Sequence, residues 1–255
     1  MSKTSFIVNQ DGLAIFTFLR PERRNAIDYD VMEDLRTALI QVKASSRIKM
    51  LMITGEGEKA FCSGGDLEVF HKLKTEKEAY EMLNKMGMIL YDLLTLPKPT
   101  VALLNGAAVG GGCEVAIACD LRLASEYSKM GFVQGNLGIT TGWGGASILM
   151  EKLLPQDALF MLYTGKLFTA EEARQIGYVQ KVFSSHHLQE QAINHCGEIL
   201  KKPYSVLTAY KEAMIRKWTS QNLFAQIQEE IKQCAKLWET DEHHKRVDSF
   251  MNRKS

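Results

Sequence analysis

The 255-residue sequence lacks the features that mark several large classes of protein. Its net charge is only +1, with acids and bases interspersed, so the composition does not call for nucleic acid or an anionic membrane surface as a partner. The longest weakly charged run, residues 99–119, is broken by Asn105, by glycines and by Glu114, whereas a membrane-spanning helix needs about 20 apolar residues. We therefore expect a protein with neither a membrane nor a nucleic acid as its partner.

Cysteine and metal-binding patterns are equally scarce. The five cysteines are odd in number and show no CxxC spacing, which favours reduced thiols in a cytoplasmic compartment over a disulfide framework. The six histidines form no HxxxH pair or Cys/His cluster, so we expect no metal. The GxSxG, GxxxxGK[ST] and GxGxxG motifs are absent, which argues against a serine hydrolase, a P-loop and a dinucleotide fold. No secretory signal is expected from the first residues.

What the sequence does contain is a 45% hydrophobic composition, enough for one large core, and alternating strand and helix patterns. An Asp-Gly pair at residues 11–12 predicts a hairpin of two strands. Asp28 is placed to cap a helix that runs to about residue 44, and a second amphipathic helix is expected over residues 76–96. Further strands are expected at residues 50–55, 101–104, 121–124 and 179–183, and helices from about residue 186 onward.

Residues 101–114 (VALLNGAAVGGGCE) are the stretch around which the chain is organised. The pattern predicts a buried strand, a turn of three glycines and a helix that begins close to Glu114. Glycines at a helix start let the backbone approach a ligand and leave N–H groups unpaired near the positive end of the helix dipole. Such a turn suits a phosphate or a developing oxyanion, although tight helix packing alone would also use these glycines.

A second glycine turn and a longer glycine-rich segment strengthen the case for a site. Residues 61–67 (FCSGGDL) follow a predicted strand, and Asp66 can cap the next helix while the Gly65 N–H points into a cleft. An ordinary strand-to-helix loop would look similar. Residues 131–145 hold too many glycines for regular secondary structure and are expected to be loops that line the site.

Four motifs, in this order, resemble the crotonase (enoyl-CoA hydratase/isomerase) superfamily, and the match covers nearly the whole chain. Each motif is modest alone, but together at these spacings they are highly specific. They are Arg20-Pro21 with Asn25-Ala26, residues 61–67, Asn105-Gly106 with residues 110–114 and Cys119-Asp120, and Leu137-Gly138 with Gly144-Gly145.

The resemblance implies an α/β fold, a crotonase-like spiral of ββα units followed by a C-terminal helical trimerisation region. We accordingly expect a core over residues 1–194 with the acyl-CoA site and an oligomerisation region over residues 195–255. The expected partners are an acyl-CoA thioester and further copies of the chain, as a homotrimer or a hexamer. No separate cofactor is expected, because coenzyme A is part of the substrate.

The resemblance also implies a mechanism and a set of residues. The backbone N–H groups of Gly65 and Gly111 would hold the thioester oxygen as it becomes an enolate, and Glu114 would act as acid or base. The residues implied in acyl-CoA binding are Arg23, Arg24, Ala26, Ser63, Gly64, Asp66, Leu67, Gly110, Thr141, Gly142, Phe250 and Arg253.

The sequence departs from the family pattern at one position that matters. Hydratases of the family use a second glutamate, in an F-x-x-P-E segment, and the corresponding position here is Gln134, preceded by Val133. An amide can position water or the thioester but cannot transfer a proton as a carboxylate does. The residues therefore favour a reaction that needs one carboxylate, such as shifting a double bond, over addition of water to a double bond.

Two other functions remain open from the sequence. The segment from Phe132 to Gly145 is similar to that of alkylmalonyl-CoA decarboxylases, in which loss of CO₂ creates the enolate directly. A protein that only binds acyl-CoA or RNA is the alternative from another class, although Glu114 argues against a pure binder. We expect an acyl-CoA enzyme of hydratase/isomerase type, and a decarboxylase is the alternative hypothesis.

Overall fold

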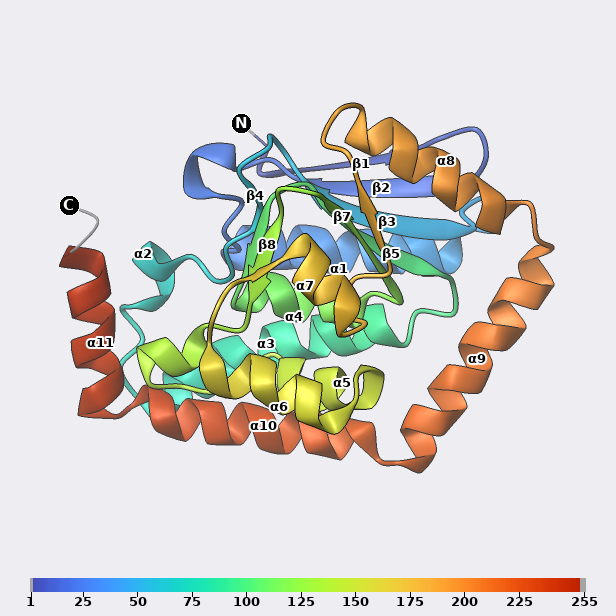
Figure 1. Cartoon of the computed structure of the whole chain (residues 1–255). Coiled ribbons are helices and arrows are strands. Elements are labelled where there is room, and N and C mark those ends of the chain that lie inside the picture. Colours follow the sequence, from blue (N-terminus) through green and yellow to red (C-terminus); the bar gives the residue numbers. More distant parts are fainter. Residues whose placement is uncertain (1, 253–255) are drawn as a thin grey trace.

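The strands form two sheets between which the chain alternates (Figure 1). The computed structural model describes residues 2–252, and within them the larger sheet has the strand order β1-β2-β3-β5-β7-β10. Its strands are β1 (Thr4–Val8), β2 (Leu13–Phe18), β3 (Met50–Gly55), β5 (Thr100–Leu104), β7 (Leu121–Ser125) and β10 (Lys181–Phe183). The smaller sheet has the order β4-β6-β8-β9, from β4 (Ala60–Cys62), β6 (Ala107–Val109), β8 (Lys129–Gly131) and β9 (Phe168–Thr169).

The order of strands and helices follows a repeated ββα unit. Strands β3, β5 and β7 lie side by side in the larger sheet, while β4, β6 and β8, which follow each of them, pair in the smaller one. All of these neighbours are parallel, as crossover connections require. The β1–β2 hairpin is antiparallel and turns at the predicted Asp-Gly pair. The predicted α/β class of stacked ββα units is confirmed.

The helices begin where local sequence signals place them. Asp28 accepts from the N–H of Val31 at the start of α1, and capping boxes at Thr75 and Thr169 begin α3 and α7. No helix within residues 2–252 is long and apolar enough to cross a membrane. The helices are α1 (Tyr29–Ala44), α2 (Leu67–Phe70), α3 (Glu76–Leu94), α4 (Gly111–Ala118), α5 (Gly145–Lys152), α6 (Pro155–Thr164), α7 (Ala170–Gln175), α8 (Leu188–Leu200), α9 (Tyr204–Ser220), α10 (Leu223–Trp238) and α11 (Asp241–Asn252), with 3-10 turns η1 (Pro21–Arg23) and η2 (Gln134–Leu137).

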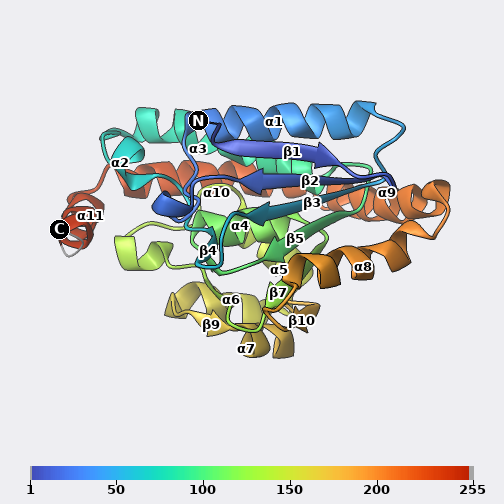
Figure 2. The same ribbon diagram turned by 90° about the horizontal axis from the view of Figure 1, so that it is seen from above.

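Helices cover both faces of the larger sheet (Figure 2). Because side chains alternate along a strand, Leu13 and Ile15 of β2 pack with Ala192 and Cys196 of α8 on one face. The intervening side chains of β2, such as Phe16, belong to the main core with α1, α3 and α4. The sheet is thus buried on both sides, which explains why its strands read as nearly continuous apolar runs.

The central glycine stretch differs from the prediction in two ways. Residues 107–109 form the additional strand β6, and α4 begins at Gly111, inside the glycine run, not close to Glu114. The first turn of α4 packs directly on β4, and only glycine fits at position 112, because a Cβ atom there would lie 2.0 Å from the carbonyl oxygen of Cys62. The three glycines therefore serve close packing as well as the turn, and Gly110 alone among them has a positive φ, +57°.

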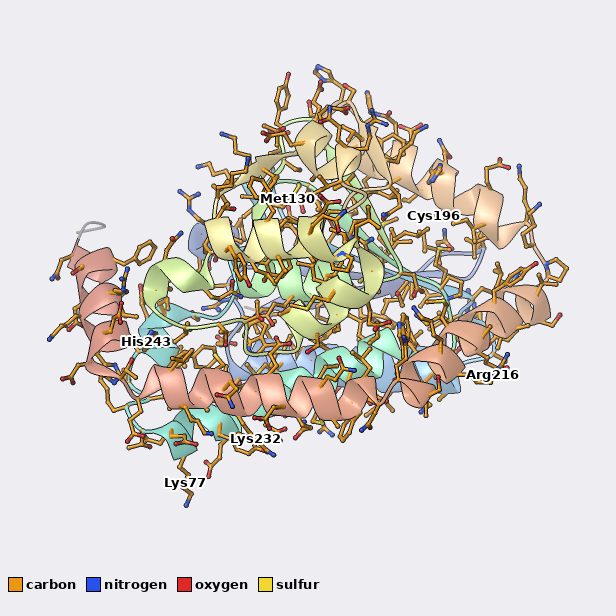
Figure 3. The ribbon with its side chains drawn as sticks, turned by 60° about the horizontal axis from the view of Figure 1, so that its bottom comes forward. Lys77, Met130, Cys196, Arg216, Lys232 and His243 are labelled. Carbon is orange, nitrogen blue, oxygen red and sulfur yellow. The ribbon has the colours of Figure 1, made fainter. Side chains whose placement is uncertain are left out.

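The C-terminal helices wrap around one side of the molecule (Figures 1 and 3). Helix α10 packs along α3, and α11 turns back so that Nδ1–H of His243 donates to the Leu137 carbonyl oxygen, 2.8 Å away. The predicted helical region is confirmed. Helix α8 spans residue 194, and the division of the chain at that residue stays a prediction.

A buried lysine closes the C-terminal end of α1. The Lys98 ammonium donates to the carbonyl oxygens of Val42, Ser45 and Ile48 at 2.6, 2.6 and 2.8 Å. A cation at this end satisfies the last carbonyls and interacts favourably with the helix dipole.

We expect Lys98→Met to destabilise the protein by about 3 kcal/mol, because three carbonyls, at least partly buried, would lose their donor. Urea unfolding at one protein concentration measures this, with Lys43→Met, on the exposed face of α1, as the matched control. A variant as stable as the control would contradict the role given to Lys98.

Candidate active site

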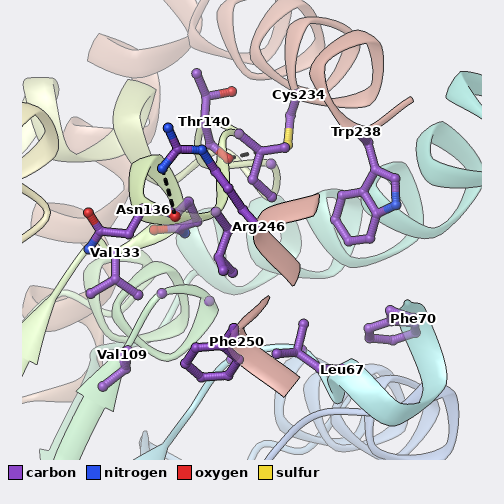
Figure 4. A pocket seen from close by; sticks show the side chains of 18 of the residues that line it. Leu67, Phe70, Val109, Val133, Asn136, Thr140, Cys234, Trp238, Arg246 and Phe250 are labelled. Atoms are coloured by element: carbon purple, nitrogen blue, oxygen red, sulfur yellow. Dashed lines mark hydrogen bonds between the residues drawn. The ribbon is translucent and has the colours of Figure 1, made fainter. Parts of the chain in front are cut away.

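A cavity of about 1210 Å³ lies between the glycine turns, α3, α10 and α11. Figure 4 shows Leu67 and Phe250 at this cavity, with Phe70 and Trp238 on one side of it. One part of the wall is apolar and comes from α2, α3, α10 and the segment between η2 and α5. Its members are Phe70, Met82, Leu83, Ile139, Trp143, Cys234 and Trp238.

The two glycine turns predicted from the sequence meet in the wall of this cavity. A Cβ atom on Gly64, which has φ +90°, would lie 2.9 Å from the backbone nitrogen of Gly111. Gly111 is the first residue of α4, so its N–H has no acceptor within the helix. The N–H of Gly65 has no acceptor among residues 2–252. The fold thus brings two unpaired N–H donors to one side of the cavity.

The indole of Trp143 packs against both donor residues. A Cβ atom on Gly111 would lie 2.2 Å from Cζ3 of Trp143, and one on Gly65 would lie 3.6 Å from its Cζ2. Trp143 is only 4% exposed. Its ring therefore occupies the space that a side chain at Gly111 would need, whereas a Cβ atom on Gly65 would meet the Phe70 ring, 2.9 Å away.

Glu114 projects from α4 into the same cavity, where its carboxylate is almost fully buried. Oε2 accepts hydrogen bonds from the N–H groups of Trp143 and Gly145 at 2.8 and 2.9 Å. Oε1 accepts from Nε2 of Gln134 at 2.9 Å and, more weakly, from the N–H of Gly142 at 3.4 Å. The glycine-rich segment predicted to line the site thus holds this carboxylate with its backbone.

Burial makes Glu114 a weak acid. Removal from water is the largest cause and the nearby Glu230 carboxylate adds to it, so that together they raise the pKa of Glu114 to about 8. The backbone N–H groups of Trp143, Gly145 and Gly142 act in the opposite direction. A carboxyl group with a pKa near neutrality is suited to proton transfer at physiological pH.

Gln134 lies beside Glu114 and presents an unused oxygen. Its Nε2 donates to Glu114, whereas Oε1 is buried and has no partner among the described residues. An unpaired buried acceptor is costly unless a ligand or water supplies a proton donor. The amide therefore has one hydrogen bond that fixes its orientation and one acceptor available at the cavity.

The loop after β2 is fastened to the turn that carries Gly65. Ile27 donates to the carbonyl oxygen of Gly64, and Asp66 donates back to that of Ile27, both at 2.8 Å. The Arg20 guanidinium pairs with the Asp66 carboxylate at 2.8 Å. This explains the Arg20-Pro21 motif, because Arg20 joins two segments that the sequence separates widely.

The structure brings together most of the residues predicted from the sequence. Those on the cavity wall are Ser63, Gly64, Gly65, Leu67, Gly110, Gly111, Glu114, Gln134, Gly142 and Phe250. Among the described residues the wall does not include Arg23, Arg24, Ala26, Asp66 and Thr141. Arg23 instead pairs with Glu68, and the Thr141 hydroxyl donates to Glu230 at 2.6 Å. Arg253 lies outside the described residues, and the roles assigned to all of these residues stay predictions.

Sequence reasoning missed the contribution of α10 and, apart from Phe250, that of the described part of α11. Glu230, Cys234 and Trp238 of α10 were interpreted only as part of a helical tail, yet Cys234 and Trp238 line the cavity. The sequence holds only a weak indication of a role in the site, namely an acid and a cysteine among the apolar positions of an amphipathic helix. No group of three His, Cys, Asp or Glu side chains in residues 2–252 is arranged to hold a metal ion.

Comparisons with known proteins agree with this geometry. The family model described as enoyl-CoA hydratase/isomerase matches residues 8–255. A crotonyl-CoA hydratase from Syntrophomonas wolfei is 35% identical over 194 residues, which are 76% of this chain and 74% of that protein. A short-chain-enoyl-CoA hydratase from Clostridium acetobutylicum is 30% identical over 218 residues, 85% of this chain and 83% of that protein.

A solved structure extends the likeness to the whole fold. The crystal structure of an enoyl-CoA hydratase from Bacillus halodurans superposes with a TM-score of 0.88 at 25% identity, covering 97% of this chain and all of that one. With a family model that matches nearly its full length, the chain belongs to the enoyl-CoA hydratase/isomerase family.

Proposed function

We propose that this protein is an acyl-CoA enzyme of the enoyl-CoA hydratase/isomerase type that stabilises a thioester enolate. The observation that carries the proposal is the meeting of the Gly65 and Gly111 N–H groups beside Glu114 in one cavity. Two fixed N–H donors stabilise negative charge that develops on a carbonyl oxygen, and they need no reorganisation when the charge appears. The positive end of α4 adds to this effect.

Glu114 is the proposed acid and base. In hydration its carboxylate takes a proton from water as the water oxygen bonds to Cβ, and the enolate receives a proton at Cα. Gln134 is a positioning group in this scheme, because its free Oε1 can accept a hydrogen bond from the water. One carboxyl group then serves both proton transfers.

The apolar part of the cavity wall supports an uncharged acyl chain as substrate. Phe70, Met82, Leu83 and Trp238 surround this part with hydrocarbon and aromatic surface. A charged acyl group buried there would lose its hydration without an opposite charge in return. The charged residues of the wall other than Glu114 lie on α11, namely Asp241, Glu242, Lys245 and Arg246.

Decarboxylation is the second candidate, favoured by the amide at position 134. The C–C bond to the carboxylate of a malonyl-type thioester would break, its electron pair would form the enolate, and CO₂ would leave. Protonated Glu114 would then supply the proton to Cα. The reaction needs one acid and no second carboxylate, which matches the pairing of Glu114 with Gln134.

Hydration of crotonyl-CoA, with wild type beside Gln134→Glu, tests the main proposal. We expect measurable wild-type turnover whose kcat/KM rises with pH through about 8, because the carboxylate form of Glu114 must accept the proton. We expect Gln134→Glu to hydrate faster, since it adds a second carboxylate.

A silent wild type that Gln134→Glu activates would reject hydration as the natural reaction. Methylmalonyl-CoA would then be the substrate to test, and decarboxylation should fall as pH rises through the same range, because it uses protonated Glu114. Inactivity of both variants on both substrates would reject the proposed function.

We also propose several finer features of the protein's organisation. We retain the division at residue 194, a homotrimer or hexamer built by the C-terminal region, and a cytoplasmic compartment. Exposed apolar side chains on α6 and α9, among them Tyr163 and Tyr210 at 82% and 73% exposure, suit association of copies. Five free cysteines suit a reducing compartment. Binding without turnover, of acyl-CoA or RNA, remains the alternative from another class.

A further inference from the structure

Two carboxylates, the buried one of Glu114 and the partly buried one of Glu230, share the N-terminus of α5. The N–H of Gly145 donates to Glu114 at 2.9 Å, while the next two N–H groups, of Ala146 and Ser147, donate to Glu230 at 3.2 and 2.8 Å. The first N–H groups of a helix have no acceptor within it and lie at the positive end of its dipole. One helix end therefore divides its free donors between Glu114 of α4 and Glu230 of α10.

Glu230 also fastens the segment that leads into α5. The hydroxyl groups of Thr141 and Ser147 each donate to its carboxylate at 2.6 Å. Between these two residues lie Trp143 and Gly145, whose N–H groups hold Glu114. Glu230, which belongs to the C-terminal helical region, thus binds both ends of the segment whose N–H groups hold the Glu114 carboxylate.

We propose that Glu230 is a positioning residue for Glu114, which fixes residues 141–147 and keeps a negative charge beside the carboxyl group that transfers the proton. Calling Glu114 the proton-transfer group rests on the proposed function. The contacts that link the two carboxylates do not.

The electrostatic surroundings predict the direction in which the pKa of Glu114 should change when Glu230 is replaced. Glu230 is a cause of the raised pKa of Glu114, second to burial, and burial raises the pKa of Glu230 as well. Cys234 also faces both carboxylates, and burial raises its pKa, so that it stays a neutral thiol. The charged residues of α5, Glu151 and Lys152, lie in its last turn, and α3 presents Leu83 to this region. Removing the charge of Glu230 should therefore lower the pKa of Glu114.

Infrared spectroscopy tests this without reference to activity. The carbonyl stretch of a protonated carboxyl group is followed against pH for wild type, Glu114→Gln and Glu230→Gln. Glu114→Gln identifies the band of Glu114 by removing it. In Glu230→Gln we expect the midpoint of that band about one pH unit lower than in wild type. Glu229→Gln, on the exposed side of the same helix, should leave it in place. An unchanged midpoint in folded Glu230→Gln would overturn the proposal.

Steady-state kinetics provide a second test of the positioning role of Glu230. We expect Glu230→Gln to lower kcat about tenfold with KM nearly unchanged, because the donors of Glu114 lose their support while the cavity wall stays intact. If this variant does not fold, Ser147→Ala replaces it, since it removes one hydroxyl donor from Glu230 and none from Glu114. We expect a smaller loss of kcat at constant KM, and an unchanged kcat would overturn the positioning role. A band shift in a protein inactive on every acyl-CoA would reject the proposed function and keep the link between the carboxylates.

Discussion

Glu114→Gln is expected to lower kcat about 10³-fold while coenzyme A binds as tightly as to wild type. Glutamine has the shape of glutamate but cannot take up or release the proton that the proposed reactions require. The replacement should fit with one adjustment. Its oxygen can keep the N–H groups of Trp143 and Gly145, and the Gln134 amide can flip so that its free oxygen accepts from the new amide.

The measurement combines steady-state kinetics with calorimetric titration of coenzyme A and thermal unfolding. Glu229→Gln serves as the control, because it makes the same chemical change at an exposed position of α10. Loss of turnover with intact binding and stability would assign the chemistry to Glu114. Turnover within tenfold of wild type would remove Glu114 from the mechanism.

Secondary structure was largely predictable because local signals decide it. Asp28 caps α1 as expected, and the Asp-Gly pair at residues 11–12 makes the hairpin. Strand β6 was missed because it has only three residues, of which two are alanines, and it exists through pairing with β4 and β8. The start of α4 at Gly111 was also missed. The contact with Cys62 that requires a glycine at position 112 comes from a distant strand, and no local pattern reports it.

The core of the site was predictable for a different reason. Parallel ββα units place the ends of successive strands together, so glycine turns after different strands converge, as Gly64 and Gly111 do. The spacing of the glycine motifs along the sequence therefore predicted that they lie close together in the structure. Glu230 could not be found in this way, because it reaches the site from a helix that follows all of these units. An acid on an amphipathic helix resembles a solvent-exposed charge until its hydrogen bonds to Thr141 and Ser147 are seen.

Gly111→Ala is expected to lower kcat about 10²- to 10³-fold, the cost of losing one oxyanion donor. The backbone conformation of Gly111 suits any residue, so the effect arises from space alone. The new Cβ atom would lie 2.2 and 2.6 Å from Cζ3 and Cη2 of Trp143. The indole cannot easily withdraw, because it is buried and the backbone of the same residue holds Glu114. Overpacking of this kind should also cost about 1–3 kcal/mol of stability.

The cause can be separated from a general loss of structure. Gly135→Ala is the matched control, because a Cβ atom there meets nothing within 4 Å although the residue lies in the glycine-rich segment that carries Trp143. We expect that control to keep full activity. Trp143→Leu in the Gly111→Ala background removes the ring that the new methyl group meets and retains the N–H that binds Glu114. Partial recovery of kcat in the double variant would show that displacement of the Gly111 N–H causes the loss. A Gly111→Ala variant as active as the control would mean that this N–H does not hold the thioester oxygen.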